Sequence, residues 1–303
     1  MSMEENAAPV IAIARVEPAP GWMSDLLTLT KARLMTMVLI TTFVGFWCGS
    51  GEALDWFLLF RALFGTALMA ASAGVLNQYI EADVDRLMHR TAQRPLPAGR
   101  MQPSTALGLG VLLGVAGLIY LYGRVSLLAA ILALATLVVY VAIYTPLKRR
   151  TSWCVAVGAV SGGIPPMVGW VSATGHLSAG AWVLFGVLFL WQMPHFLAIA
   201  WMYRDEYAQA GFVMLRRNDL SGMKTALESL ISAILLLAVT IMPLFLHMAS
   251  PWYAVAAVLC NGGLLWYASQ FLMRRCRVSA RTLFFASIIY LPAVLGLLVF
   301  AKI

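Results

Sequence analysis

The sequence predicts an all-α membrane protein with nine transmembrane helices. Of its 303 residues, 61% are hydrophobic and only 11% are charged, against roughly 25% charged residues in soluble proteins. Long apolar runs recur along the chain without a period of two, which favours helices over barrel strands. Lysine and arginine gather in alternate loops. These observations exclude a soluble α/β enzyme, a disordered protein and a secreted disulfide scaffold.

Each transmembrane helix needs about 20 mostly apolar residues, and nine segments meet this requirement. They lie at about 30–49, 57–79, 104–122, 126–144, 154–172, 180–202, 225–248, 252–272 and 282–300. The four cysteines show neither paired nor metal-type spacing, so we interpret them as free thiols.

Residues 1–25 are expected to form a mobile cytoplasmic tail, and 26–303 a single transmembrane domain. Glu4 and Glu5 oppose the positive region of a signal peptide, and Ile11–Ile13 is too short for its apolar core.

The basic residues set the predicted orientation. Eighteen of the 21 lysines and arginines lie in the tail or in loops that follow even-numbered spans. Positive loops face the cytoplasm, so the N-terminus is expected inside and the C-terminus outside. The net charge of +8 is thereby explained without nucleic acid. Two long cytoplasmic loops, about 80–103 and 203–224, are where function is expected.

An acidic cluster ends the second span. Asn77, Glu81 and Asp85 are spaced by four residues and share one helix face, whereas Asp83 points away. Oxygen ligands of this kind suit Mg²⁺, which binds through one or two carboxylates plus substrate phosphates. The alternative is a solvated helix end with acids beside arginines.

An arginine-rich loop follows directly. Arg90, Arg94 and Arg100 lie on a segment that two prolines and a glycine keep from forming a regular helix. Guanidinium groups match phosphate oxygens, so the loop is a candidate diphosphate site. The alternative is ordinary positive charge on a cytoplasmic loop.

Three stretches carry a family resemblance. The pattern Asn77-x-x-x-Glu81-x-x-x-Asp85 resembles the first acidic motif of the UbiA-type intramembrane prenyltransferases. Glu81–Arg100, Tyr144–Thr151 and Trp191–Phe196 resemble the branch of that family that farnesylates protoheme, the heme O synthases. The resemblance runs from about Leu29 to the end of the ninth span.

The resemblance implies transfer of the farnesyl group of farnesyl diphosphate to a vinyl group of heme B. Water adds as well, which gives heme O and pyrophosphate. Mg²⁺ would join the diphosphate to the acidic face, and metal and basic residues would stabilise the leaving group. The implied catalytic residues are Asn77, Glu81, Asp85, Arg94 and Lys148. The implied diphosphate-binding residues are Lys31, Arg90, Arg100 and Arg149.

Two further predictions concern a second metal and the heme. Asp205 or Glu206 is expected to hold a second Mg²⁺, the alternative being an interfacial pair with Arg204 and Arg217. His195 lies inside the sixth span, where an ionisable group is a functional candidate. It is a candidate heme ligand, with a histidine hydrogen-bonded between helices as the alternative. His89 is the second candidate.

Two other functions remain open. The protein could prenylate another acceptor, such as a quinone precursor or chlorophyllide, or it could be a secondary transporter for an anionic or heme-like solute. Transporters place their sites near the midplane, whereas the acids here lie at cytoplasmic helix ends, which favours an enzyme. The expected location is the bacterial inner membrane. The expected partners are farnesyl diphosphate, heme B, the lipid bilayer and a downstream heme-modifying enzyme, with no nucleic acid.

Overall fold

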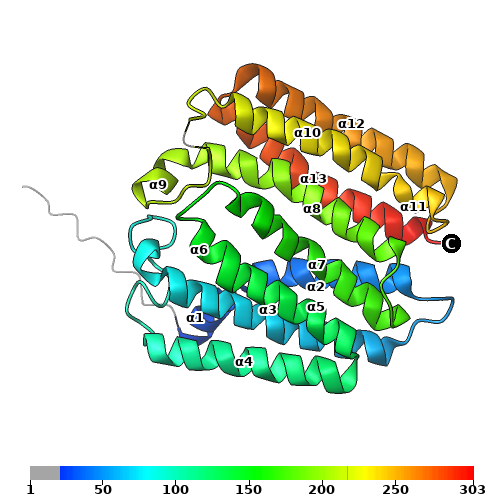
Figure 1. Ribbon diagram of the computed structural model, residues 1–303, viewed down its shortest axis with the longest axis horizontal. Helices are drawn as coiled ribbons and strands as arrows, with labels where there is room; N and C mark the ends of the chain where they lie inside the picture. The colour runs from blue at the N-terminus through cyan, green and yellow to red at the C-terminus, as the bar shows by residue number, and fades with distance from the viewer. Residues whose placement is uncertain (1–20, 217) are drawn as a thin grey trace, which may run out of the picture.

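The computed structural model describes residues 21–216 and 218–303. Within them, long helices lie side by side as a bundle (Figure 1). Nine helical segments of this described part are long and apolar enough to cross a membrane, which confirms the predicted fold. They are α2 (Ala32–Gly49), α3 (Trp56–Asp85), α4 (Pro103–Arg124), α5 continued by η1 and α6 (Leu127–Leu147), α7 (Cys154–Thr174), α8 (Ala179–Met202), α10 continued by α11 (Met223–Phe245), α12 (Pro251–Arg274) and α13 (Arg277–Ala301).

Short helices complete the chain. They are α1 (Trp22–Leu29), η1 (Val139–Tyr144), α6 (Thr145–Leu147), α9 (Arg204–Gln209) and α11 (Met242–Phe245). Helix α1 begins at Trp22, so residues 22–25 of the segment expected to be a tail are helical. The remainder of that expectation, residues 1–20, lies outside the described residues. Helix α3 runs six residues beyond the predicted span, so the acidic face is part of one continuous helix.

Helix α7 is the most buried of these spans and packs against α2, α5 and α8. Glycines bring it into backbone contact with α2. A Cβ atom at Gly169 would overlap the carbonyl oxygen of Thr42, and one at Gly45 would overlap that of Pro166. Small residues permit such close approach between membrane helices. The α2–α7 contact therefore closes the centre of the bundle at this depth.

Helix α1 is fastened to α3. The Gln78 amide donates to the carbonyl oxygens of Thr28 and Leu29 at 2.7 and 3.0 Å, which satisfies acceptors that the end of a helix leaves free. A Cβ atom at Gly74 would lie 2.8 Å from the carbonyl oxygen of Thr30. These two contacts hold the turn in which Lys31 adopts a left-handed backbone conformation with φ of 53°.

Candidate active site

The three oxygen-bearing residues at the end of α3 share a buried face. Asn77, Glu81 and Asp85 are 0%, 5% and 1% exposed, whereas Asp83 is exposed. This confirms the predicted shared face and the opposite direction of Asp83. Unpaired buried carboxylates are unfavourable, so their partners determine how the site is built.

Each carboxylate has one cation. Lys148, after α6, donates to Oε1 of Glu81 at 2.7 Å. Arg94, in the arginine loop, donates to Oδ2 of Asp85 at 2.6 Å. The Asn77 amide donates to Oε2 of Glu81 at 3.0 Å. Charge is thus balanced locally along the acidic face.

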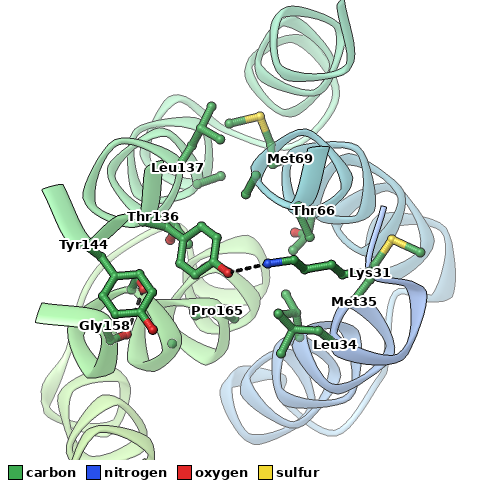
Figure 2. Close-up of a pocket in the computed structure, with 18 of the residues that line it drawn as sticks. Lys31, Leu34, Met35, Thr66, Met69, Thr136, Leu137, Tyr144, Gly158 and Pro165 are labelled. Atoms are coloured by element: carbon green, nitrogen blue, oxygen red, sulfur yellow. Dashed lines mark hydrogen bonds between the residues drawn. The ribbon is translucent and has the colours of Figure 1, made fainter. Parts of the chain in front are cut away.

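Lys31 lies at the inner edge of this cluster. Its Nζ donates to Oδ1 of Asn77 and to the hydroxyl of Tyr140 at 3.1 Å, the bond that Figure 2 marks at Lys31. Thr145 accepts from the Asn77 amide at 2.9 Å. Asn77 is therefore held by Lys31, which directly precedes α2, and by Thr145 of α6.

Arg90 approaches from the opposite side. Its guanidinium donates to the Tyr207 hydroxyl at 2.8 Å and lies over the rings of Tyr203 and Tyr207 at 5.6 and 5.1 Å. The segment that follows Tyr207 is also anchored, because the amide of Val213 donates to the carbonyl oxygen of Lys148 at 2.6 Å. The α9 region thus covers the cluster.

These side chains enclose a polar cavity of about 220 Å³. Two carboxylates and four cationic side chains line it, which leaves a positive excess suited to a polyanion. The charged members of the lining are Lys31, Glu81, Asp85, Arg90, Arg94 and Lys148.

A second, mostly apolar cavity of about 220 Å³ adjoins the polar one. Lys31, Tyr140, Tyr144 and Phe196 line both cavities. Figure 2 shows side chains such as Leu34, Thr66 and Pro165 arranged around it. Its walls come from α2, α3, α5, η1, α7 and α8. The pair of cavities suits a ligand with an anionic head and an apolar tail.

Lys31 and Lys148, the two lysines of the site, lie outside the spans and differ in acidity. Burial, together with the charges of Lys148 and Arg94, lowers the pKa of Lys31 to about 7. Burial also opposes the charge of Lys148, but the Glu81 carboxylate outweighs this effect and raises the pKa of Lys148 above its usual value. Lys148 is therefore the firmly charged lysine of the site at neutral pH.

The donor set fits a hard divalent cation. Asn77, Glu81 and Asp85 offer only oxygen ligands on one buried helix face. In the described part of the chain no three His, Cys, Asp or Glu side chains converge as a ready-made metal cage. Mg²⁺ usually binds through one or two carboxylates plus substrate phosphates, and this arrangement suits that mode of binding.

Several predicted site residues lie elsewhere. Arg100 is outside the lining of the polar cavity, and its guanidinium is held by both carboxylate oxygens of Asp25 at 2.8–3.1 Å. Arg149 is exposed, and so is His89. None of these three residues lines the polar cavity.

The residues expected to hold a second metal also lie outside both cavities. Asp205 is exposed and lies 3.7 Å from Arg204, and Glu206 is half-buried beside it. This placement corresponds to the interfacial pair with Arg204. The other proposed member, Arg217, lies outside the described residues.

His195 packs between helices α8 and α13. Its Nδ1 is 2.8 Å from the Ser287 hydroxyl, and its ring stacks on Trp191 and Phe284 at centroid distances of 4.9 and 5.0 Å. On the same helix, Gln192 and Phe196 line the apolar cavity, whereas His195 does not. Of the two interpretations that the sequence left open, the geometry favours the interhelical hydrogen bond.

Three residues of the site were missed in the sequence. Tyr140, Thr145 and Tyr207 bind Lys31, Asn77 and Arg90 respectively. Tyr140 lies four residues before the Tyr144–Thr151 stretch, Thr145 lies within it, and Tyr207 directly follows Glu206. The spacing of four residues from Tyr140 to Tyr144 was the available signal.

The fold and this site define an intramembrane prenyltransferase: the chain belongs to the UbiA prenyltransferase family, whose model matches residues 38–289. Its relatives include proteins named protoheme IX farnesyltransferase. The one from Opitutus terrae is 43% identical over 92% of this chain and 95% of its own. The one from Myxococcus xanthus is 40% identical over 96% of this chain and 98% of its own.

Solved structures share the fold at lower identity. A digeranylgeranylglyceryl phosphate synthase superposes with a TM-score of 0.80 at 16% identity, covering 92% of this chain and 98% of that one. A UbiA homolog from Archaeoglobus fulgidus bound to GPP and Mg²⁺ gives 0.64 at 12% identity, covering 91% and 99%. The chain is therefore an integral multi-pass membrane protein of this fold.

Proposed function

We propose that the protein transfers the farnesyl group of farnesyl diphosphate to a vinyl group of heme B, with addition of water, to give heme O and pyrophosphate. One observation carries the proposal: a buried acidic face with paired cations lies directly above an apolar cavity. The names of relatives that are about 40% identical over nearly their full length support heme B as the acceptor.

The diphosphate occupies the polar cavity in this proposal. Arg90, Arg94 and Lys148 bind its oxygens, and Lys31 binds at the boundary with the apolar cavity, where the tail begins. Asn77, Glu81 and Asp85 would hold Mg²⁺ together with the diphosphate, and the ion would supply Lewis-acid stabilisation of negative charge. The GPP and Mg²⁺ bound by the Archaeoglobus homolog support the pairing of metal and prenyl diphosphate in this fold.

Catalysis consists of stabilising the charge that develops as the bond between C1 and oxygen breaks. The electron pair leaves with pyrophosphate, and preorganised cations in a site shielded from water are most effective at this task. The rings of Tyr140 and Tyr144 line the junction of the two cavities. Their π faces attract positive charge, as the Lys148 ammonium 4.6 Å from the Tyr144 ring illustrates.

The vinyl group of the acceptor supplies the electron pair for the new carbon–carbon bond. A vinyl carbon of heme B attacks C1 of the farnesyl group, and the carbon left electron-deficient takes a hydroxyl group from water as one proton is released. Exclusion of bulk water until this stage protects the allylic cation. We place the heme against the membrane-facing side of the cavities without assigning an axial ligand.

The proposed setting is the bacterial inner membrane, with the N-terminus in the cytoplasm and the C-terminus outside. The bias of 18 out of 21 basic residues supports this orientation. Both substrates are amphiphiles with apolar bodies, which suits delivery from the bilayer. The product is passed to a downstream heme-modifying enzyme.

The test offers purified protein farnesyl diphosphate and Mg²⁺ with one acceptor at a time: heme B, a quinone precursor or chlorophyllide. Mass analysis identifies any prenylated product. We expect product with heme B only. Prenylation of another acceptor instead would move the protein to a different branch of the family. Solute uptake into liposomes without pyrophosphate release would identify a transporter.

A further inference from the structure

The lining of the apolar cavity ends at a similar level on three helices. On α3 it ends at Thr66, on α5 at Ala133 and on α7 at Val168. One turn beyond Val38, the backbones of α2 and α7 touch at Thr42 and Gly169. The α2–α7 contact described above therefore lies immediately beyond the deepest lining residues.

The depth of this cavity can be calculated from the length of helix α3 that lines it. Helix α3 joins the acidic face to the deep end as one uninterrupted helix, and Thr66 precedes Asn77 by 11 positions, 77 − 66. At about 1.5 Å per residue, the deep end lies about 16 Å from the level of Asn77.

The length of prenyl tails can be compared with this depth. An extended chain gains roughly 3.5 Å for every three main-chain bonds, so three isoprene units of four bonds each reach about 14 Å and four units about 19 Å. A tail of three units fits above Thr66, and a fourth would meet the α2–α7 contact.

We propose that Thr66, Ala133 and Val168 form a floor that sets the length of the prenyl tail, admitting three isoprene units and rejecting a fourth. The floor gives the protein its preference for a farnesyl over a geranylgeranyl donor. This inference rests on the proposed function, since it names which prenyl diphosphate that site accepts.

The side chains of the floor support this role. Ala133 and Val168 are 3% and 1% exposed, so they pack fully around the end of the cavity. The hydroxyl of Thr66 is buried and finds no hydrogen-bond partner among the described residues. Figure 2 shows Thr66 among the side chains around the cavity, beside Lys31.

Two variants change the depth in opposite directions. Ala133→Phe fills the deep end, and the double variant Thr66→Ala with Val168→Ala extends it. Ile131→Phe is the matched control, because Ile131 is on the same helix but 51% exposed on its outer face. Each protein receives geranyl, farnesyl and geranylgeranyl diphosphate with heme B and Mg²⁺. Binding of the three diphosphates is measured in parallel by thermal shift.

Ala133→Phe should raise the kcat/KM ratio of geranyl to farnesyl diphosphate at least tenfold, since one methylene in an apolar pocket discriminates 10–200-fold. The double variant should raise the kcat/KM ratio of geranylgeranyl to farnesyl diphosphate by about tenfold or more, since it removes methyl groups at the deep end of the cavity. The control should keep the wild-type ratios. Should Ala133→Phe fail to fold, Ala133→Leu takes its place with the same expected direction.

Unchanged ratios in both depth variants would overturn the floor, and would mean that the tail leaves sideways past Leu34. A shift in diphosphate binding without any heme product would support the floor and reject heme as the acceptor. Heme farnesylation with unchanged selectivity would support heme as the acceptor and reject the floor. The two proposals therefore fail separately.

Discussion

Arg94 and Asp85 bind each other, with Nη1 of the arginine 2.6 Å from Oδ2 of the aspartate. The sequence assigns one to phosphate and the other to metal. Asp85 is almost fully buried, so its charge needs this partner in the substrate-free protein. In the proposed mechanism, substrate binding would exchange both contacts: Asp85 would release Arg94 and help to hold the metal, and Arg94 would bind the diphosphate in place of Asp85.

Asp85→Asn should abolish most activity at ordinary Mg²⁺ concentrations, because it removes a charged metal ligand while preserving the size of the side chain. The matched control is Asp83→Asn, whose side chain is exposed on the other face of α3. Farnesyl transfer is measured for both after their folding is checked by size-exclusion chromatography. Equal losses in the two variants would contradict the assignment of the buried face.

Arg94→Ala should weaken use of farnesyl diphosphate and leave heme binding nearly intact. A hydrogen bond to a charged group contributes about 1.5–3 kcal/mol, so KM for the diphosphate should rise by about 10- to 100-fold. Arg149→Ala, at an exposed position, is the control and should change KM little. A normal KM in Arg94→Ala would remove this arginine from the diphosphate site.

Asp25 and Arg100 should act as a positioning pair for the arginine loop. Their bidentate contact, 2.8–3.1 Å, fixes the end of the segment that carries Arg90 and Arg94. Asp25→Arg and Arg100→Asp should each raise KM for farnesyl diphosphate several-fold, and the double swap should restore much of it. If Arg100 binds phosphate directly, the double swap will remain as impaired as Arg100→Asp.

His195→Ala should leave the Soret band of added heme unchanged and lower the thermal stability. The histidine bonds to Ser287 and stacks between two aromatic rings, so its removal loosens the contact of α8 with α13. Heme titration followed by absorbance, beside a melting curve, checks both parts. An altered Soret band with unchanged stability would restore His195 as the heme ligand.

Asp219 should make stability depend on acid pH. It accepts hydrogen bonds from the amides of Lys224 and Thr225, at 3.1 and 2.8 Å, in the first turn of α10. Burial opposes its charge, but these bonds prevail and hold the pKa of Asp219 below its usual value. The contribution of Asp219 to the free energy of unfolding is therefore complete above about pH 4, the usual pKa of an aspartate. This contribution is lost as the pH falls through the lower pKa of Asp219 in the folded protein.

The variant Asp219→Ala tests this contribution. At pH 7 the free energy of unfolding of this variant should be about 1 kcal/mol lower than that of the wild type, as for the loss of a helix cap. The difference in melting temperature from the wild type should narrow as the pH falls below about 4. A difference that stays constant from pH 7 to pH 3 would show that the ionised carboxylate is not responsible.

Contacts between residues far apart in the chain could not be predicted from the sequence. The spans and the face shared by Asn77, Glu81 and Asp85 follow from helical periodicity and could be predicted, because both depend on neighbours along one helix. The partner of Arg100 lies 75 positions away and that of His195 lies 92 away. Such pairings depend on how helices pack, so the sequence showed the charges and the ring but not what they bind.

The depth of the apolar cavity was also beyond the sequence. Glycines are common in membrane helices. Only the contacts of Gly45 with Pro166 and of Gly169 with Thr42 show that these two glycines bring α2 and α7 together. The Pro95 to Gly99 segment, by contrast, was correctly expected to be irregular, since proline and glycine act through the local backbone.

The central claim is tested most directly by the fate of heme B in water labelled with oxygen-18. Purified protein is incubated with heme B, farnesyl diphosphate and Mg²⁺, and the heme is analysed by mass spectrometry while pyrophosphate is quantified. The account predicts a heme that has gained one farnesyl group and one labelled hydroxyl, with one pyrophosphate released for each. Pyrophosphate release with unmodified heme, or a farnesylated heme without the label, would contradict it.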